Sequence, residues 1–165
     1  MAEIRFHDGV DRIGGNKFLV DDGKMRVLMD FGMSFSEEDK YFSEYLSPRK
    51  SDSLSDLIDL GILPEIDGLY RRDYVEYMDI KEDPGPGVDA VLLTHAHLDH
   101  CAYLNYIRPD IPLYCSPESK LIMQNFDDTG STEYLTVKES FKTYENQKGG
   151  ISRATGDRVA VERDI

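Results

Sequence analysis

The chain has 165 residues, of which 40% are hydrophobic, and its 32 Asp and Glu against 19 Lys and Arg give a formal net charge of −13. This length suits one domain with its own core, and the 10 Tyr and 7 Phe argue against wholesale disorder. Because no run of about 18 apolar residues occurs, a membrane-spanning helix is excluded, and the N-terminus lacks the pattern of a secretory signal. The acidity disfavours non-specific nucleic-acid binding by this chain alone. We expect a soluble, cytoplasmic protein.

The first segment of the chain predicts strands. Three β-prone runs are expected to form them: residues 3–7, 17–20 and 26–31. The Asp22-Gly23 step between the last two runs is typical of a hairpin turn. Gly14 and Gly15, which precede the hairpin, indicate either a plain turn or a close approach of the backbone to a site.

Short helices are expected next. Residues 36–46 begin with a capping-box pattern, and residues 53–60 end before Gly61. Residues 61–87 contain three prolines and are expected to be mostly loop and turn.

The second half of the chain predicts alternating strands and helices. The near-continuous apolar run at 88–94 is typical of a strand buried on both faces. The elements expected after it are a helix at 97–107, a strand at 111–115, a helix at 116–127, loop at about 128–156 with one helix near 137–144, and a strand at 158–162. The whole pattern predicts one α/β domain over residues 1–165, an α+β mixed sheet with flanking helices.

One cluster of residues indicates a functional site. Three of the four histidines, His95, His97 and His100, lie within six residues, with Asp99 between them. They follow the buried strand at 88–94, and ligand sites in open α/β sheets gather at the C-terminal ends of strands. Imidazole and carboxylate are ligands that zinc accepts. A polar turn with merely exposed histidines is the weaker alternative, so the sequence predicts a metal site.

The cluster resembles a known signature. The residues Thr94-His95-Ala96-His97-Leu98-Asp99-His100 resemble the HxHxDH motif of the metallo-β-lactamase superfamily of metallohydrolases. The opening strands resemble that superfamily at 14–16 and 28–32, and the flanking sequence at 47–49 and 69–73 is most similar to the ribonuclease J-type β-CASP branch. The resemblance implies the N-terminal half of a metallo-β-lactamase αβ/βα fold.

The resemblance also implies roles for individual residues. His95 and His97 would ligate a first metal ion, and Asp99 and His100 a second, with Asp99 also acting on the metal-bound water as the catalytic residue. Asp30 would hydrogen-bond near the ligands and fix their orientation. The implied cofactor is zinc, two ions per complete site, with manganese as the alternative. The implied activity of the complete protein is phosphodiester hydrolysis in RNA.

The sequence departs from the family pattern after His100. The family supplies further histidine and aspartate ligands downstream, but no histidine follows His100 in this chain. The carboxylates available there lie in no recognisable motif: Asp127, Asp128, Asp157 and Asp164. We therefore expect an incomplete domain that binds zinc weakly or partially and is inactive alone.

Two other functions stay open. The same fold would also hydrolyse a small thioester or lactone, and a non-catalytic module would use exposed sheet surface for association, as a homo-oligomer.

Several other side chains have two interpretations each. Arg71 and Arg72 would meet substrate phosphates or lie solvated, the latter being favoured. His7 and Cys101 are more typical of structural residues than of ligands.

Overall fold

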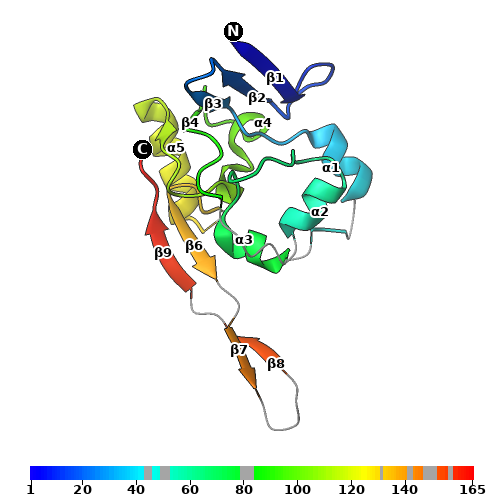
Figure 1. The fold of residues 1–165 in the computed structure, drawn as a ribbon, viewed down its shortest axis with the longest axis vertical. Helices are drawn as coiled ribbons and strands as arrows, with labels where there is room; N and C mark the ends of the chain where they lie inside the picture. The colour runs from blue at the N-terminus through cyan, green and yellow to red at the C-terminus, as the bar shows by residue number, and fades with distance from the viewer. Residues whose placement is uncertain are drawn as a thin grey trace.

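The computed structural model describes residues 1–42, 46–48, 53–78, 84–130, 132–140, 143–146, 152–155 and 158–165. Its main sheet has the strand order β1-β2-β3-β4-β5 (Figure 1). The strands are β1 (Glu3–Asp8), β2 (Lys17–Asp21), β3 (Arg26–Met29), β4 (Ala90–Leu92) and β5 (Leu113–Tyr114). β1, β2 and β3 pair antiparallel, whereas β3, β4 and β5 pair parallel. The mixed α/β fold predicted from the sequence is confirmed.

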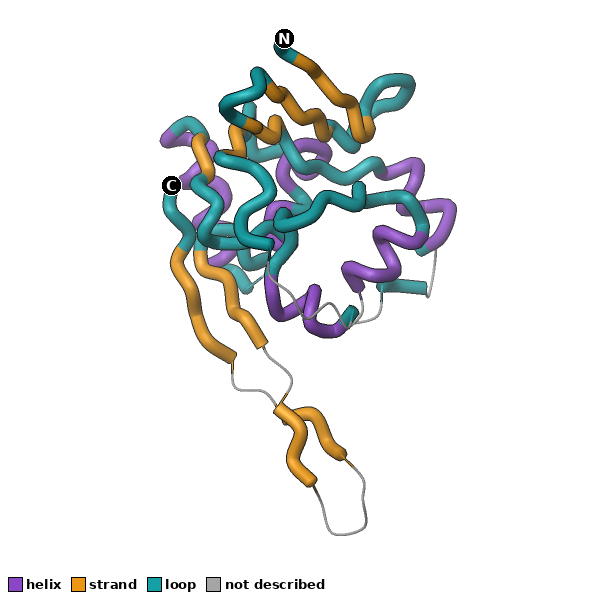
Figure 2. The backbone as a smooth tube through the Cα atoms, viewed as in Figure 1, coloured by secondary structure: helices purple, strands orange, loops and turns teal. Residues whose placement is uncertain are grey.

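Short helices and long irregular segments complete the body of the molecule (Figure 2). The helices are α1 (Phe35–Tyr41), α2 (Ser53–Asp59), α3 (Arg72–Tyr77), α4 (Leu98–Cys101) and α5 (Pro117–Asp128), with a 3-10 turn at Leu104–Tyr106. α5 begins as predicted, because the Ser116 hydroxyl accepts a hydrogen bond from the Ser119 amide and proline follows the cap. α3 was expected to be loop, but the prolines of that segment lie outside its six residues.

The segment at 128–156 differs most from expectation. The predicted loop with a helix near 137–144 is wrong, because the chain forms strands there. The strands are β6 (Thr136–Ser140), β7 (Thr143–Asn146), β8 (Ser152–Thr155) and β9 (Arg158–Glu162). β6 pairs antiparallel with β9, and β7 with β8, so that the second ribbon projects beyond the first, away from the body (Figure 1). A polar strand such as β6 is stabilised by a partner about 20 residues away, which local composition does not reveal.

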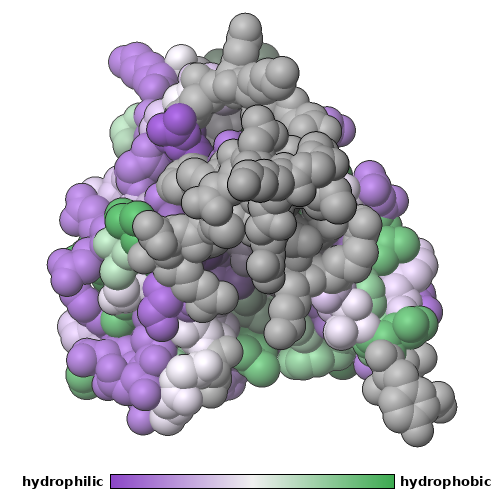
Figure 3. Space-filling view, turned by 90° about the horizontal axis from the view of Figure 1, so that it is seen from below, coloured by the Kyte–Doolittle hydropathy of each residue, from purple (hydrophilic) through white to green (hydrophobic). Residues whose placement is uncertain are grey.

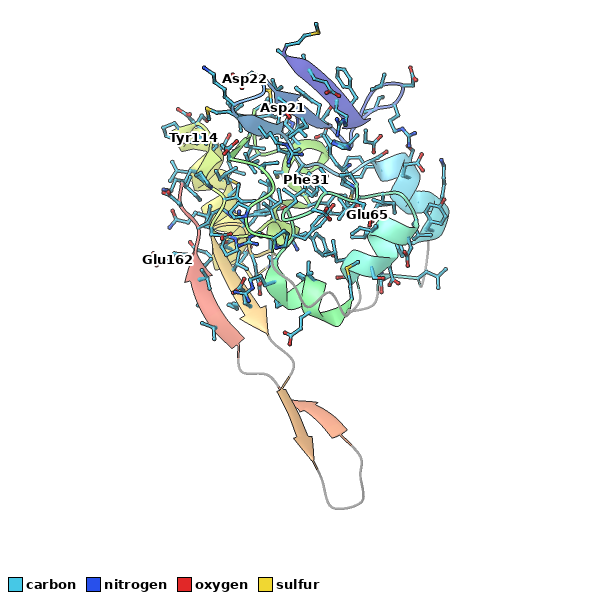
Figure 4. The ribbon with its side chains drawn as sticks, in the orientation of Figure 1. Asp21, Asp22, Phe31, Glu65, Tyr114 and Glu162 are labelled. Carbon is cyan, nitrogen blue, oxygen red and sulfur yellow. The ribbon has the colours of Figure 1, made fainter. Side chains whose placement is uncertain are left out.

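The core lies between one face of the sheet and the helices. Four inward-facing sheet residues are no more than 3% exposed: Leu19, Leu28, Val91 and Leu113. They belong to one cluster with buried residues of the helices and loops, including Leu54, Leu57, Leu104 and Met123. Phe31, just after β3, is fully buried at the centre of the molecule (Figure 4). The residues that follow β3 and β4 are therefore attached to strands that are packed into the core.

One face of the molecule carries many polar side chains. Around the residues drawn in grey, hydrophilic side chains dominate one flank of the lower face, with scattered hydrophobic ones between them (Figure 3). In the described part of the chain, no helix has the length and apolar character needed to cross a bilayer.

Arg163 fixes the C-terminal ribbon to the body. Its side chain is buried, and its guanidinium donates to four backbone carbonyls at 2.9–3.1 Å, those of Leu104, Ile107, Arg108 and Tyr134. Burial, assisted by the charge of Arg71, lowers the pKa of Arg163 to about 10. The buried cation is tolerated because its donors are paired with carbonyl oxygens.

Replacing this guanidinium tests its role. We expect Arg163→Ala to lower the free energy of unfolding by about 3 kcal/mol, because several buried carbonyls lose their partner. Urea unfolding followed by circular dichroism measures it. Arg5→Ala is the matched control, since the ion pair that Arg5 makes with Glu3 is exposed. Equal losses in both variants would contradict the assignment.

Candidate functional site

β4 places the histidine cluster at the edge of the sheet. Val91 is fully buried in β4, and this strand ends at Leu92, three residues before His95. His97 has an extended backbone (φ −82°, ψ 148°) and α4 begins directly after it. Because β3 and β4 run parallel, the residues that follow both strands meet at the same sheet edge.

The structure brings the predicted ligands together. The ring centroids of His95 and His97 are 4.5 Å apart, and those of His95 and His100 are 4.0 Å apart. Asp99 Oδ2 lies 3.5 Å from Nε2 of His100. His97 is exposed and the other three are partly exposed, so the group is open to solvent. The predicted convergence of these side chains is therefore present in the structure.

Asp30 anchors this group from the end of β3. It has a left-handed backbone (φ 55°), and it is only 2% exposed. Its carboxylate accepts hydrogen bonds from the Thr94 amide (2.8 Å), the Thr94 hydroxyl (2.9 Å) and Nδ1 of His100 (2.8 Å). Because an ionised carboxylate only accepts, the network assigns the His100 proton to Nδ1. Nε2 of His100 is left with a free electron pair, 3.2 Å from the side-chain amide nitrogen of Asn16.

Thr94 extends the network to His95, a link that sequence reasoning missed. Its hydroxyl lies 3.0 Å from Nδ1 of His95 and donates its own proton to Asp30. It can therefore accept a hydrogen bond from Nδ1 of His95. In that tautomer the free electron pair of His95 is on Nε2, which lies 3.1 Å from Nδ1 of His97. The only sequence signal for Thr94 is its position directly before the motif.

The donor types and one pair distance fit a bound metal ion. With Zn–N bonds of about 2.0–2.1 Å, two nitrogens on a tetrahedral zinc lie about 3.3 Å apart. The His95–His97 nitrogen pair is close to that value, and the same separation suits a hydrogen bond between the two rings when one of these nitrogens is protonated. In the described part of the chain, however, no group of three or more His, Cys, Asp or Glu is arranged to hold a metal ion. The described residues thus supply donors in pairs and no larger ligand set.

Backbone contacts fix α4 against the segment after β3. The Phe31 amide donates to the His100 carbonyl (2.7 Å), and the Met33 amide donates to the Leu98 carbonyl (3.0 Å). Between them, a Cβ on Gly32 would lie 1.7 Å from the Asp99 carbonyl oxygen. Only glycine therefore allows the two segments to lie this close.

The Gly14-Gly15-Asn16 loop lies on the other side of the cluster. Both glycines have positive φ (83° and 75°). The backbone amide of Asn16 donates to the Asp99 carbonyl at 3.2 Å. Of the two interpretations left open by the sequence, the structure favours close approach to the site. Beneath the loop, the fully buried Lys17 ammonium donates to the Gly15 carbonyl at 3.1 Å and lies 3.5 Å from Asp8. Lysine in a strand gives no signal of such burial.

The remaining candidate ligands lie elsewhere. His7 is on β1, where burial, helped by the charges of Arg5 and Lys17, lowers its pKa. Cys101 is fully buried, and burial raises its pKa to about 11, which disfavours the thiolate that binds metal.

The downstream carboxylates do not join the cluster in the described part of the chain. Asp127 accepts hydrogen bonds from the amides of Tyr134, Leu135 and Thr136, so it stabilises a turn. Asp128 and Asp164 are exposed, and Asp157 lies outside the described residues.

Arg71 neither lies solvated, as favoured from the sequence, nor is available for substrate phosphate, so both interpretations are wrong for it. It is 2% exposed and forms a bidentate pair with Asp73, with N–O distances of 3.0 and 2.7 Å. It also donates to the carbonyls of Asn105 and Lys138. Arg72 is exposed.

Comparisons with known proteins agree with the resemblance. A family model described as the beta-lactamase superfamily domain matches residues 72–139. The chain is 27% identical to ribonuclease J of Helicobacter pylori, over 76% of this chain and 15% of that protein, and 28% identical to an RNase J-like protein of Methanocaldococcus jannaschii, over 78% and 21%. A crystal structure of a protein of unknown function from Enterococcus faecalis aligns with a TM-score of 0.62 and 26% identity, over 98% of this chain and 40% of that one.

These findings confirm the resemblance to the metallo-β-lactamase superfamily and to its ribonuclease J-like members. The chain spans about a fifth or less of the length of the curated relatives named here.

The Asp30 network predicts the tautomer of His100. In Asp30→Asn the side chain offers one acceptor in place of two, so we expect His100 to shift from the Nδ1-protonated form toward a mixture of tautomers. Imidazole ¹⁵N chemical shifts, recorded without metal above pH 8, report the change. Asp127→Asn is the control, because Asp127 is also a carboxylate that accepts several hydrogen bonds but lies outside the cluster. An unchanged His100 spectrum would disprove the network.

The close approach at Gly32 predicts a steric effect. We expect Gly32→Ala to destabilise the chain by about 3 kcal/mol and to shift the amide signals of α4, because its Cβ overlaps the Asp99 carbonyl. Gly23→Ala is the control: its Cβ meets nothing within 4 Å, and only its φ of 85° opposes the change, at a cost of about 1 kcal/mol. Thermal unfolding and two-dimensional NMR measure both. Similar effects in the two variants would refute the steric argument.

Proposed function

We propose that this chain supplies the metal-binding half of a metal-dependent hydrolase that cleaves phosphodiester bonds in RNA. The observation that carries the proposal is the convergence of three imidazoles and Asp99 at one sheet edge, oriented by the buried Asp30. The superfamily match supports hydrolysis, and the relatives named ribonuclease J support RNA as the substrate. The β-CASP branch and a cytoplasmic location belong to the same proposal.

In this proposal the motif holds two metal ions through separate pairs of ligands. His95 and His97 hold the first ion, and Asp99 and His100 hold the second. Zinc is the proposed metal, with manganese as the alternative. Two such ions, when bound, lower the pKa of a water molecule toward neutrality and stabilise the negative charge that develops on the phosphate. With two protein donors for each ion, binding by this chain alone is weak.

The side chains of this chain prepare the site for that chemistry. Asp30 holds the His100 proton on Nδ1, which leaves Nε2 free as a ligand atom. Thr94 does the same for His95 by accepting from its Nδ1. Asp99, partly exposed, orients the attacking water and accepts its proton. Asn16 and the backbone around Gly32 limit the movement of His100 and Asp99.

Two observations favour a second substrate class, a small thioester or lactone. The net charge of −13 repels a polyanion, and Arg71, a candidate phosphate contact, is buried in a pair with Asp73. A small substrate with one reacting carbonyl requires no extended basic surface. The two proposals share the site and differ in what it cleaves.

Metal binding tests the ligand assignment. We expect His97→Ala to weaken Zn²⁺ binding by the 165-residue chain about 10-fold or more, because one of two donors to an ion is lost. Isothermal titration calorimetry at fixed pH measures the affinity. His7→Ala is the matched control, since His7 lies outside the cluster, and it should leave the affinity unchanged. Equal affinities for the wild type and His97→Ala would refute the assignment of His97 as a metal ligand.

Substrate assays test the reaction. Single-stranded RNA, a thioester and a lactone are each incubated with Zn²⁺ or Mn²⁺ and either this chain or a longer polypeptide that contains it. We expect background rates for the chain alone, RNA cleavage by the longer polypeptide, and a loss of about 1,000-fold in Asp99→Asn. Thioester or lactone turnover without RNA cleavage would favour the second substrate class. Turnover by the chain alone that His97→Ala abolishes would contradict its expected inactivity.

A further inference from the structure

We propose that Lys17 is a positioning residue of the candidate site, whose buried ammonium holds the Gly14-Gly15-Asn16 loop against the motif at 95–100. Lys17 is the first residue of β2, and its side chain is fully buried. It lies two residues before Leu19, which belongs to the core, so both side chains point to the same face of the sheet. Lysine is almost never fully buried without partners, so its contacts must explain its presence there.

The ammonium of Lys17 contacts three different segments of the chain. It donates to the Gly15 carbonyl (3.1 Å) and lies 3.5 Å from the carboxylate of Asp8, at the end of β1. It also lies 5.6 Å from the centre of the Tyr103 ring, shortly after α4, and an aromatic face within about 6 Å attracts a cation. Burial lowers the pKa of Lys17, and the charge of Asp8 opposes that shift. One buried cation thus joins the loop to β1 and to the segment that follows α4.

The ion pair with Asp8 does not by itself explain a lysine at this core position. Replacing a buried ion pair with well-packed apolar side chains is often neutral or stabilising. The Gly15 carbonyl gives the ammonium a role that an apolar side chain cannot take. Gly15 is buried, and a buried carbonyl without a donor is costly. The lysine is therefore suited to fixing the loop.

One rigid peptide unit carries this restraint to the candidate site. The carbonyl of Gly15 and the backbone amide of Asn16 belong to the same peptide plane, so fixing one end fixes the other. At one end the carbonyl accepts from Lys17, and at the other the Asn16 amide donates to the Asp99 carbonyl (3.2 Å). The side-chain amide of Asn16 then lies 3.2 Å from Nε2 of His100. Lys17 thus acts on both residues through the loop, without touching either.

NMR spectra of the metal-free chain, recorded above pH 8, test this inference. Lys17→Met keeps the length of the side chain and removes the donor. We expect the backbone amide signal of Asn16 to shift, because its hydrogen bond to Asp99 lengthens. The ¹⁵N signal of His100 Nε2 should move to the position that it has in Asn16→Ala, which lacks the side-chain amide. Signals of Asn16 and His100 that match the wild type would overturn the inference.

A matched control separates positioning from a general loss of stability. Leu57→Ala leaves a cavity on α2, where Leu57 is 1% exposed, so it destabilises the chain without changing the loop. It should leave the signals of Asn16 and His100 in place. Shifts of both signals in Leu57→Ala as large as those in Lys17→Met would contradict a specific role for Lys17.

The wild type gives a second measurement that is independent of whether Lys17→Met folds. The ammonium signal of Lys17, assigned through its side-chain carbons at about pH 6, should be protected from exchange with water and should show a nuclear Overhauser effect to the Tyr103 ring. Lys40, whose side chain is 58% exposed, is the internal reference. Exchange at Lys17 as fast as at Lys40 would disprove the buried contacts.

The consequence for catalysis rests on the proposed function. In a longer polypeptide that contains this chain, Lys17→Met should lower kcat for RNA about 10-fold or more and leave KM nearly unchanged, because it displaces reacting groups and not substrate contacts. An unchanged kcat would overturn the positioning role. The NMR measurements require neither metal nor substrate, so they test Lys17 separately from the proposed hydrolysis.

Discussion

The buried carboxylate of Asp30 is the contact on which the candidate site depends. It joins the end of β3 to Thr94 after β4 and to His100 on α4, across 64 and 70 residues of sequence. A buried carboxylate without partners would be costly, so the three donors that surround it stabilise the charge and are fixed by it. The same contact therefore holds the two sheet ends together and determines which nitrogen of His100 faces the site.

How far the sequence predicts this arrangement depends on whether a signal is local. The strand before the motif and the cluster at 95–100 are contiguous, so an apolar run followed by ligand-type residues is sufficient to place them. Asp30 could be assigned only through the resemblance, because nothing near it in sequence indicates burial. Lys17 and Thr94 were missed, since their roles exist only once distant segments meet.

The errors have a common physical origin in polar residues that the fold buries or pairs. Arg71 suggested a surface cation, yet Asp73 and two distant backbone carbonyls satisfy its guanidinium inside the protein. The polar stretch at 136–140 suggested loop and helix, yet pairing with β9 makes it a strand, and Arg163 at the end of that ribbon is held by the body. In both places a long-range partner outweighs local propensity.

The close approach of the backbone at Gly32 to α4 has a consequence for how the candidate site forms during folding. Asp99 and His100 reach their positions only when α4 lies against the backbone after β3, so the ligand geometry is absent from any partly folded state in which β3 and β4 are unpaired. A metal ion held there as proposed would bind only after the parallel pairing forms, and it would stabilise the native state by mass action. Long-range parallel pairing is a slow event in folding, so the rate of ion uptake by an unfolded chain would follow the formation of that strand pair.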